Sequence, residues 1–246
     1  MGELIAVASG KGGTGKTTVC AGIATALARS GKRVLCIDCD VGLRNLDISL
    51  GLADRCPLSF LDVCEGGYPL SQAAVHPDFP SLHFLTAPMN RPPEQIDLDA
   101  FGIFLTGARS SYDFIFLDAP AGVDAGFRLA ATFADRCLLV TGSGPAAVRD
   151  AARTAQVLEL MGKTNVRLVV NRVNSKLIRA MDTTIDDVMD TAGLPLLGIV
   201  PEDKNVTLAA TFNQPLLKYK PRSAAAKACE RIAKRILGLP VPMTIR

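Results

Sequence analysis

A glycine-rich segment near the N-terminus constrains this chain more than any other feature. Residues 9–18 read SGKGGTGKTT, which completes the pattern G-x-x-x-x-G-K-[ST] directly after the apolar run 4–8. Glycines let a backbone turn its N–H groups toward phosphate oxygens, and a following helix presents its positive N-terminus to the same anions. The pattern therefore predicts a strand, a phosphate-binding loop and a helix, in that order.

The side chains of this loop have the chemistry of a nucleotide site. We expect Lys16 to reach the β- and γ-phosphates and Thr17 to hold Mg²⁺ through its hydroxyl. The remaining phosphate contacts are expected from Gly12, Gly13, Thr14, Gly15 and Thr18. A flexible glycine turn without a ligand is the alternative, but it does not account for the Lys-Thr-Thr that follows.

Short apolar runs alternate with amphipathic segments along the rest of the chain. The runs are nearly continuous in Val, Ile and Leu, which is typical of strands buried on both faces of a parallel sheet. We expect strands at 4–8, 33–37, 82–86, 114–117, 137–141, 166–171 and 196–200. We expect short helices and loops over 41–81, and longer helices at 17–30, 98–110, 145–161, 178–192 and 223–237. This alternation predicts an α/β fold of three layers, with helices on both faces of a mostly parallel sheet.

The composition is that of an ordinary globular protein. Its 246 residues are 48% hydrophobic and 21% charged, which excludes a disordered or collagen-like chain. A net charge of +3 does not by itself indicate nucleic acid binding. No internal repeat or linker is visible, so we expect one domain over residues 1–246. No run approaches the roughly 20 apolar residues that span a bilayer, and the N-terminus does not resemble a signal peptide, so we expect a cytoplasmic protein.

Seven cysteines lie scattered through apolar segments, which is typical of buried, reduced thiols. Cys36 and Cys39 have the C-x-x-C spacing, but residues three apart on a strand face opposite sides. An iron–sulfur reductase or carrier with the same nucleotide core is another alternative, but it would need cysteines near residues 118–127 or a C-terminal C-x-x-C, and the sequence has neither. We therefore expect no metal or redox site at these residues.

Acidic residues follow two of the predicted strands. Asp38 and Asp40 share one strand parity after the run 33–37, so both can face the phosphates. Asp118 follows the run 114–117, in the Walker B pattern of an acid bonded to a Mg²⁺-bound water. Ligands of such sheets bind at the carboxyl ends of the strands. A carboxylate there can hold Mg²⁺ through water or orient an attacking water.

Together these motifs resemble the MinD/ParA family of P-loop ATPases. Lys11 makes the loop similar to the deviant Walker A motif, KGGxGK[ST], and the resemblance implies that Lys11 acts across a dimer interface. A solvated lysine is the alternative. Residues 38–47, DCDVGLRNLD, resemble switch I, and residues 118–123, DAPAGV, resemble switch II of the MinD branch. The resemblance implies that Asp40 positions the hydrolytic water and that Asp38 supports the metal shell around Thr17 and Asp118.

Two later segments resemble the base-binding positions of the same family. Asn171 and Arg172 end the run 166–170, where the family has an asparagine that hydrogen-bonds adenine. Pro201 and Asp203 belong to a segment similar to the IPED sequence beside the base, although Pro201 can also be a simple strand terminator. The resemblance therefore implies ATP and ADP with Mg²⁺ as ligands.

The resemblance also implies a cellular role. It implies an ATPase that forms a homodimer on binding ATP and Mg²⁺ and hydrolyses ATP as a spatial switch in septum placement. Division-inhibitor and activator proteins of the Min system are the implied partners. Peripheral contact with the inner face of the cell membrane is compatible with this role, but residues 239–246 contain Pro240 and Pro242, so we expect no clear membrane-targeting helix there.

Two alternatives share the nucleotide core. One is a ParA-like ATPase for DNA partitioning or flagellar positioning, and the other is a nucleotide-dependent scaffold with negligible hydrolysis. The basic residues that weakly permit DNA binding are Arg222, Lys227, Arg231, Lys234 and Arg235. We do not expect DNA as a partner.

Overall fold

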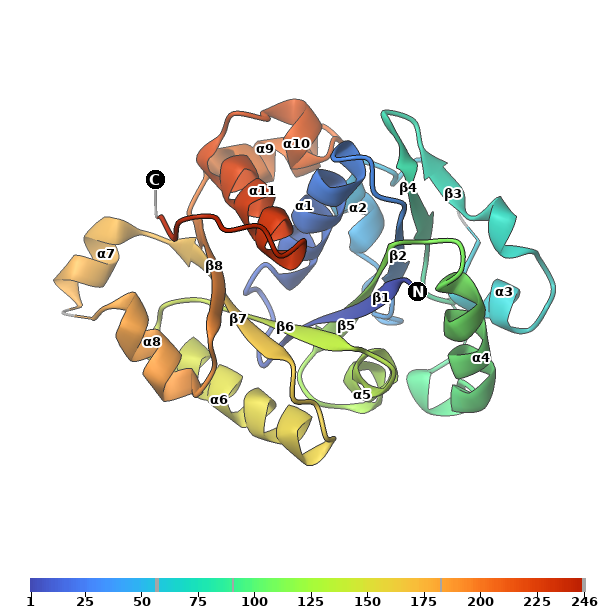
Figure 1. The fold of residues 1–246 in the computed structure, drawn as a ribbon, viewed down its shortest axis with the longest axis horizontal. Coiled ribbons are helices and arrows are strands. Elements are labelled where there is room, and N and C mark those ends of the chain that lie inside the picture. The colour runs from blue at the N-terminus through green and yellow to red at the C-terminus, as the bar shows by residue number, and fades with distance from the viewer. Residues whose placement is uncertain (56–57, 90, 182, 245–246) are drawn as a thin grey trace.

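The computed structural model describes residues 1–55, 58–89, 91–181 and 183–244 (Figure 1). Within these residues one sheet has the strand order β3-β4-β2-β5-β1-β6-β7-β8. All neighbouring strands are parallel except β3 and β4, which pair antiparallel. The strands are β1 (Glu3–Ser9), β2 (Val34–Asp38), β3 (Ala74–His76), β4 (Phe79–Leu85), β5 (Phe114–Ala121), β6 (Arg136–Thr141), β7 (Val166–Val173) and β8 (Leu196–Pro201).

Helices cover both faces of the sheet, as Figure 1 shows. They are α1 (Lys16–Arg29), α2 (Leu46–Leu50), α3 (Phe60–Cys64), α4 (Leu98–Ala108), α5 (Ala125–Thr132), α6 (Pro145–Leu160), α7 (Ser175–Ala180), α8 (Ile185–Ala192), α9 (Lys204–Thr211), α10 (Leu216–Tyr219) and α11 (Ala224–Ile236). Helices α1 and α11 pack on one face, and α4, α5 and α6 pack on the other. This arrangement confirms the expected three-layer α/β fold.

The central strand β1 shows why its sequence is apolar at every position. Ile5 and Val7 pack in one core cluster with Ile23 of α1, whereas Leu4 and Ala6 pack in a second cluster on the opposite face. A strand covered by helices on both faces buries both sets of alternating side chains. Every strand expected from the sequence is present, with its ends displaced by a few residues.

Some local expectations are wrong. The segment 178–192 is not one helix, because α7 ends at Ala180 and α8 begins only after Thr184. Thr184 has an extended backbone and caps α8 in a reciprocal pair with Asp187, so a start signal interrupts the apolar periodicity. The segment 41–81 contains the short strand β3 in addition to helices and loops. Helices α5, α9 and α10 have eight or fewer residues, too short to show a clear helical period.

The described cysteines are free thiols, and all of them except Cys64 are buried. Cys36 and Cys39 belong to core clusters on opposite faces and are free thiols, while Cys56 lies outside the described residues. Within the described chain, no helix combines the length and the apolar character needed to cross a bilayer. Residues 239–244 are neither helix nor strand, and Arg235 of α11 donates hydrogen bonds to the carbonyls of Val241 and Pro242. The rest of the expected tail, residues 245–246, lies outside the described residues.

Candidate functional site

The glycine-rich loop connects β1 to α1 at the carboxyl edge of the sheet. Gly13 and Gly15 have φ angles of 79° and 82°, in the left-handed region that disfavours other residues. Gly15 directly precedes the first residue of α1. A side chain at Gly15 would also place its Cβ 2.3 Å from Nδ2 of Asn171. Gly15 is therefore required both by its backbone conformation and by the close approach of β7.

Lys16 is buried at the start of α1 and forms an ion pair with Asp118 of β5. Its Nζ lies 2.8 Å from Oδ1 of Asp118 and 3.1 Å from Oγ1 of Thr17. Burial by itself would lower the pKa of Lys16, but the adjacent Asp118 carboxylate outweighs burial and raises it. The loop lysine is therefore charged and points at the end of β5, where phosphate oxygens would compete for it.

A second carboxylate lies beside this pair. Asp38 and Asp118 are register partners on β2 and β5, and both are 1% exposed. The Asp38 carboxylate accepts hydrogen bonds from the backbone N–H groups of Asp40 (2.9 Å) and Leu46 (3.1 Å). Burial, and then the charge of Asp118, raises the pKa of Asp38 to about 7. Two buried carboxylates that share one lysine attract a further cation.

The residues present suit a Mg²⁺ ion that is also held by phosphates. Among the described residues, no group of three or more His, Cys, Asp or Glu could hold a metal ion alone. Mg²⁺ in phosphate sites commonly takes one or two protein ligands and completes its shell with phosphate oxygens and water. Thr17 and Asp118 are in contact here, with Asp38 beside them. The buried hydroxyl of Thr14 has no partner within the described chain, as expected of a group that contacts a ligand.

Asp40 and Lys11 lie farther out than these residues. Asp40 follows the end of β2, is half-buried, and accepts a hydrogen bond from the N–H of Leu43 at 3.1 Å. It lies close enough to Asp118 for the two charges to interact. Lys11 is exposed on the same loop that buries Lys16. One loop thus presents one lysine to the interior of the site and another to solvent.

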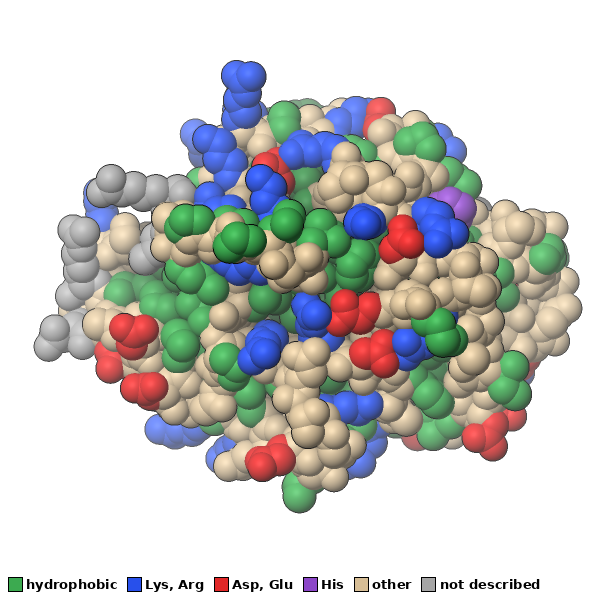
Figure 2. All heavy atoms as spheres, in the orientation of Figure 1, with side chains coloured by type: hydrophobic (Ala, Val, Ile, Leu, Met, Phe, Trp, Pro, Cys, Tyr) green, Lys and Arg blue, Asp and Glu red, His purple; other side chains and the backbone are tan. Residues whose placement is uncertain are grey.

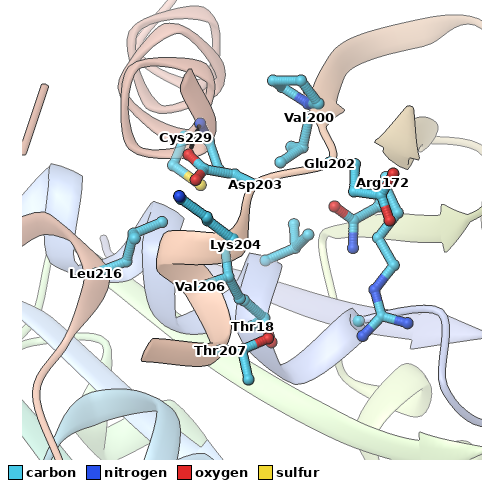
Figure 3. Close-up of a pocket in the computed structure, with 15 residues that line it drawn as sticks. Thr18, Arg172, Val200, Glu202, Asp203, Lys204, Val206, Thr207, Leu216 and Cys229 are labelled. Atoms are coloured by element: carbon cyan, nitrogen blue, oxygen red, sulfur yellow. Dashed lines mark hydrogen bonds between the residues drawn. The ribbon is translucent and has the colours of Figure 1, made fainter. Parts of the chain in front are cut away.

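A cavity of about 300 Å³ lies beside the loop, and its size suits a nucleoside (Figure 3). The close-up shows Asp203, Lys204 and Cys229 on one side and Arg172 with Glu202 on the other. The lining residues come from α1, β7, β8, α9, α10 and α11 and include Thr18, Val19, Asn171, Arg172, Val200, Pro201, Asp203, Val206, Leu216 and Cys229. Phosphate loop and cavity are contiguous, because Gly15 lines both. The space-filling view in Figure 2 shows lysine, arginine and acidic side chains close together near the middle of this face of the molecule.

Comparison with known proteins identifies the family. A model of the CobQ/CobB/MinD/ParA nucleotide binding domain matches residues 5–216. The chain belongs to this MinD/ParA family. The chain is 38% identical to the septum site-determining protein MinD of Bacillus subtilis (strain 168), and the alignment covers 100% of this chain and 92% of that protein.

Solved MinD structures have the same fold. A chain of the MinC:MinD cell division protein complex of Aquifex aeolicus matches with a TM-score of 0.90 and 34% identity over 98% of both chains. The septum site-determining protein MinD of Pyrococcus horikoshii, complexed with Mg-ADP, matches with a TM-score of 0.83 and 30% identity over 96% of both chains. Members of the MinD/ParA family are P-loop ATPases, so nucleotide and Mg²⁺ binding is the chemistry of this family.

The residues at the MinD/ParA base position also have structural partners. Asn171 donates from Nδ2 to the carbonyl of Thr14 at 2.8 Å, and Arg172 donates from Nη1 to the carbonyl of Gly13 at 3.0 Å. Asp203 caps α9 and also accepts the N–H of Ala225, the second residue of α11, at 3.1 Å. Burial opposes the effect, but these N–H donors lower the pKa of Asp203. Contact of all four predicted residues, Pro201 included, with a base stays a prediction.

Several cavity residues have no local sequence signal. Val206 and Thr207 of α9, Leu216 of α10 and Cys229 of α11 reach the cavity only because the C-terminal helices pack against α1. For α9 alone there was a sequence signal, because this helix begins directly after Asp203, a predicted site residue. Conversely, motifs in the sequence singled out Lys16, Thr17, Asp38 and Asp118, which lie together in the structure, and their roles toward a nucleotide stay predictions.

Proposed function

We propose that this chain is a MinD-type ATPase, which binds ATP with Mg²⁺, forms a face-to-face homodimer and hydrolyses ATP to ADP and phosphate. The observation that supports this most is the pair of lysines on one loop, with Lys16 buried against Asp118 and Lys11 exposed. An exposed lysine can reach the nucleotide of a second copy. There it would offset the charge that develops during phosphoryl transfer, as an arginine finger does.

The roles of the other residues follow from their positions. Lys16 would exchange its contact with Asp118 for the β- and γ-phosphates. Thr17 and Asp118 would hold Mg²⁺, with Asp38 behind them, and the ion would neutralise phosphate charge. Asp40, half-buried beyond β2, would orient the attacking water. The phosphates would also contact the loop from Gly12 to Thr18.

The cavity is compatible with the adenine base of ATP. Because Nδ2 of Asn171 is bonded to the carbonyl of Thr14, its Oδ1 is the atom left to accept a hydrogen bond from a ligand. The exocyclic amino group of adenine can donate such a bond. Pro201 and Asp203 would complete the base side of the cavity.

For the cellular role, we propose a spatial switch in division-site selection. The names of the relatives support this role, and the Aquifex complex supports a division-inhibitor partner. An activator protein and peripheral contact of a cytoplasmic protein with the inner face of the membrane complete the proposal. DNA partitioning has less support, since the Bacillus and Pyrococcus relatives both carry septum-site names.

The test combines turnover with the oligomeric state. Wild-type protein should dimerise with ATP and Mg²⁺ but not with ADP, and it should release phosphate in the presence of anionic liposomes. Lys16→Ala should lose both properties, while Asp40→Ala should keep the dimer and lose turnover. Unchanged turnover in both variants would contradict the proposal. Salt-sensitive, ATP-dependent binding to DNA in a gel shift would favour the ParA-like alternative.

A further inference from the structure

A bulge interrupts the carboxyl end of β7. The pairing of β7 with β8 shifts register between Val170 and Val173, and Arg172 has a φ angle of 53°. In a regular strand, consecutive side chains point to opposite faces of the sheet. Here the bulge directs the side chains of both Asn171 and Arg172 to the phosphate-binding loop, which matches the tendency of bulges to re-aim side chains near active sites.

The two side chains bind two consecutive carbonyls of the loop. Arg172 holds the carbonyl of Gly13 at 3.0 Å, and Asn171 holds the carbonyl of Thr14 at 2.8 Å. Figure 3 shows the guanidinium of Arg172 extended away from Glu202. Each peptide unit is planar and trans, so its carbonyl and the N–H of the next residue point in opposite directions. Holding the Gly13 carbonyl therefore fixes the direction of the Thr14 N–H, which points away from Arg172 and is left to contact a ligand.

We propose that Arg172 is a positioning residue that pre-organises the phosphate-binding loop through the Gly13 carbonyl. This inference rests on the proposed nucleotide-binding function and deepens it. Arg172 acts on the loop backbone before the nucleotide arrives, whereas base recognition would act on the nucleoside in the cavity. A left-handed backbone is unfavourable for arginine, so the side-chain contact offsets that strain.

The left-handed backbone at Arg172 allows two variants to separate loss of the guanidinium from relief of backbone strain. Arg172→Gln keeps a side chain in the left-handed conformation but removes the guanidinium. Arg172→Gly removes the guanidinium and also relieves the strain, since glycine adopts positive φ freely. Arg167→Gln is the matched control, because Arg167 is an exposed arginine near the opposite end of the same strand.

Two measurements separate positioning from general stability. Hydrogen exchange of the amides from Gly13 to Lys16 is followed in the nucleotide-free protein, and the Kd values of Mg-ADP and adenosine are compared. Both Arg172 variants should exchange these amides faster than wild type and bind Mg-ADP about tenfold more weakly, with a much smaller loss of adenosine affinity, because the loop backbone would contact the phosphates. Arg172→Gly should show this loss even if its melting temperature equals or exceeds that of wild type. Arg167→Gln should match wild type in all measurements.

Three outcomes are decisive. Loop exchange at the wild-type rate in both Arg172 variants would overturn the proposal, whatever happens to nucleotide affinity. Equal losses of ADP and adenosine affinity would also overturn it, because they would assign Arg172 to the nucleoside. A wild-type protein that binds no ADP would contradict the proposed function instead, and the exchange rates of the nucleotide-free loop would still decide the role of Arg172.

Discussion

Asp38 and Asp118 lie directly opposite one another on neighbouring parallel strands, and the two carboxylates share the single ammonium group of Lys16. Asp118 takes the short contact with Lys16, whereas Asp38 is held by two backbone N–H groups. At a pH above the pKa of Asp38, the nucleotide-free site therefore contains more buried negative charge than positive charge. This imbalance prepares the site for a cation and makes it sensitive to pH.

The raised pKa of Asp38 makes the nucleotide-free protein less stable as the pH rises. Its folded value of about 7 exceeds the value of roughly 3.9 for an unfolded aspartate. Between these values the folded state binds more protons, so the contribution of Asp38 is fully present below pH 4 and is lost as the pH rises through 7. Urea unfolding in EDTA, from pH 5 to pH 8, should show this decline.

The Asp38→Asn variant is the test of that assignment. It removes the titrating group, so its free energy of unfolding should fall less steeply over pH 5–8 than that of wild type. The variant also loses one of two backbone contacts, which lowers its stability by a similar amount at each pH. The same slope in both proteins would show that another group titrates.

Replacing Lys16 should lower the free energy of unfolding, because it leaves a buried carboxylate without its ion-pair partner. Lys16→Met leaves Asp118 without its partner, and we expect the free energy of unfolding to fall by about 3 kcal/mol at pH 8. Adding Asp118→Asn should recover most of this loss without restoring nucleotide binding. Urea unfolding of the two single variants and the double variant gives the coupling energy, and additive effects would argue against the ion pair.

The conformation of Gly15 predicts a variant with two separable defects. Gly15→Ala places a Cβ 2.3 Å from Nδ2 of Asn171 at a φ angle of 82°. We expect a loss of about 2 kcal/mol in unfolding free energy, together with loss of ADP binding. The double variant Gly15→Ala, Asn171→Gly should remove the clash with Asn171 but keep the strain of the positive φ angle at residue 15.

A neighbouring glycine supplies the control for this variant. An added Cβ at Gly12 meets no atom of the described chain within 4 Å, so Gly12→Ala should leave thermal stability unchanged. If Gly12→Ala and Gly15→Ala lower the melting temperature equally, the close approach of Asn171 is not the cause.

Lys11 should affect turnover but not the binding of ADP by a single copy. Its side chain is exposed, so Lys11→Ala should bind Mg-ADP within about twofold of wild type and lose roughly 10³-fold in the rate of ATP hydrolysis. Phosphate release in the presence of liposomes measures the rate, and Lys234→Ala, an exposed lysine of α11, serves as control. Full turnover in Lys11→Ala would show that Lys11 is a solvated lysine with no role in hydrolysis.

Local patterns of the sequence determined the elements and the phosphate loop. The spacing of Gly10, Gly15 and Lys16 specifies a turn whose conformation depends on adjacent residues, and the continuous apolar runs specify strands buried on both faces. The acidic residues at the strand ends could be placed at one edge of the sheet, because parallel strands end there together. These features are local, so no long-range contact was needed to predict them.

Only the tertiary structure decided which of these features meet. Strands that are apolar on both faces carry little information about their neighbours, so the order that places β2 beside β5 had to come from packing. That order brings Asp118 to Lys16 across 102 residues of sequence and sets Asp38 beside it. The bulge that directs Arg172 to Gly13 is equally a product of packing, because it depends on how β7 pairs with β8. The sequence therefore determined the chemistry of the site, and packing over long range decided its geometry.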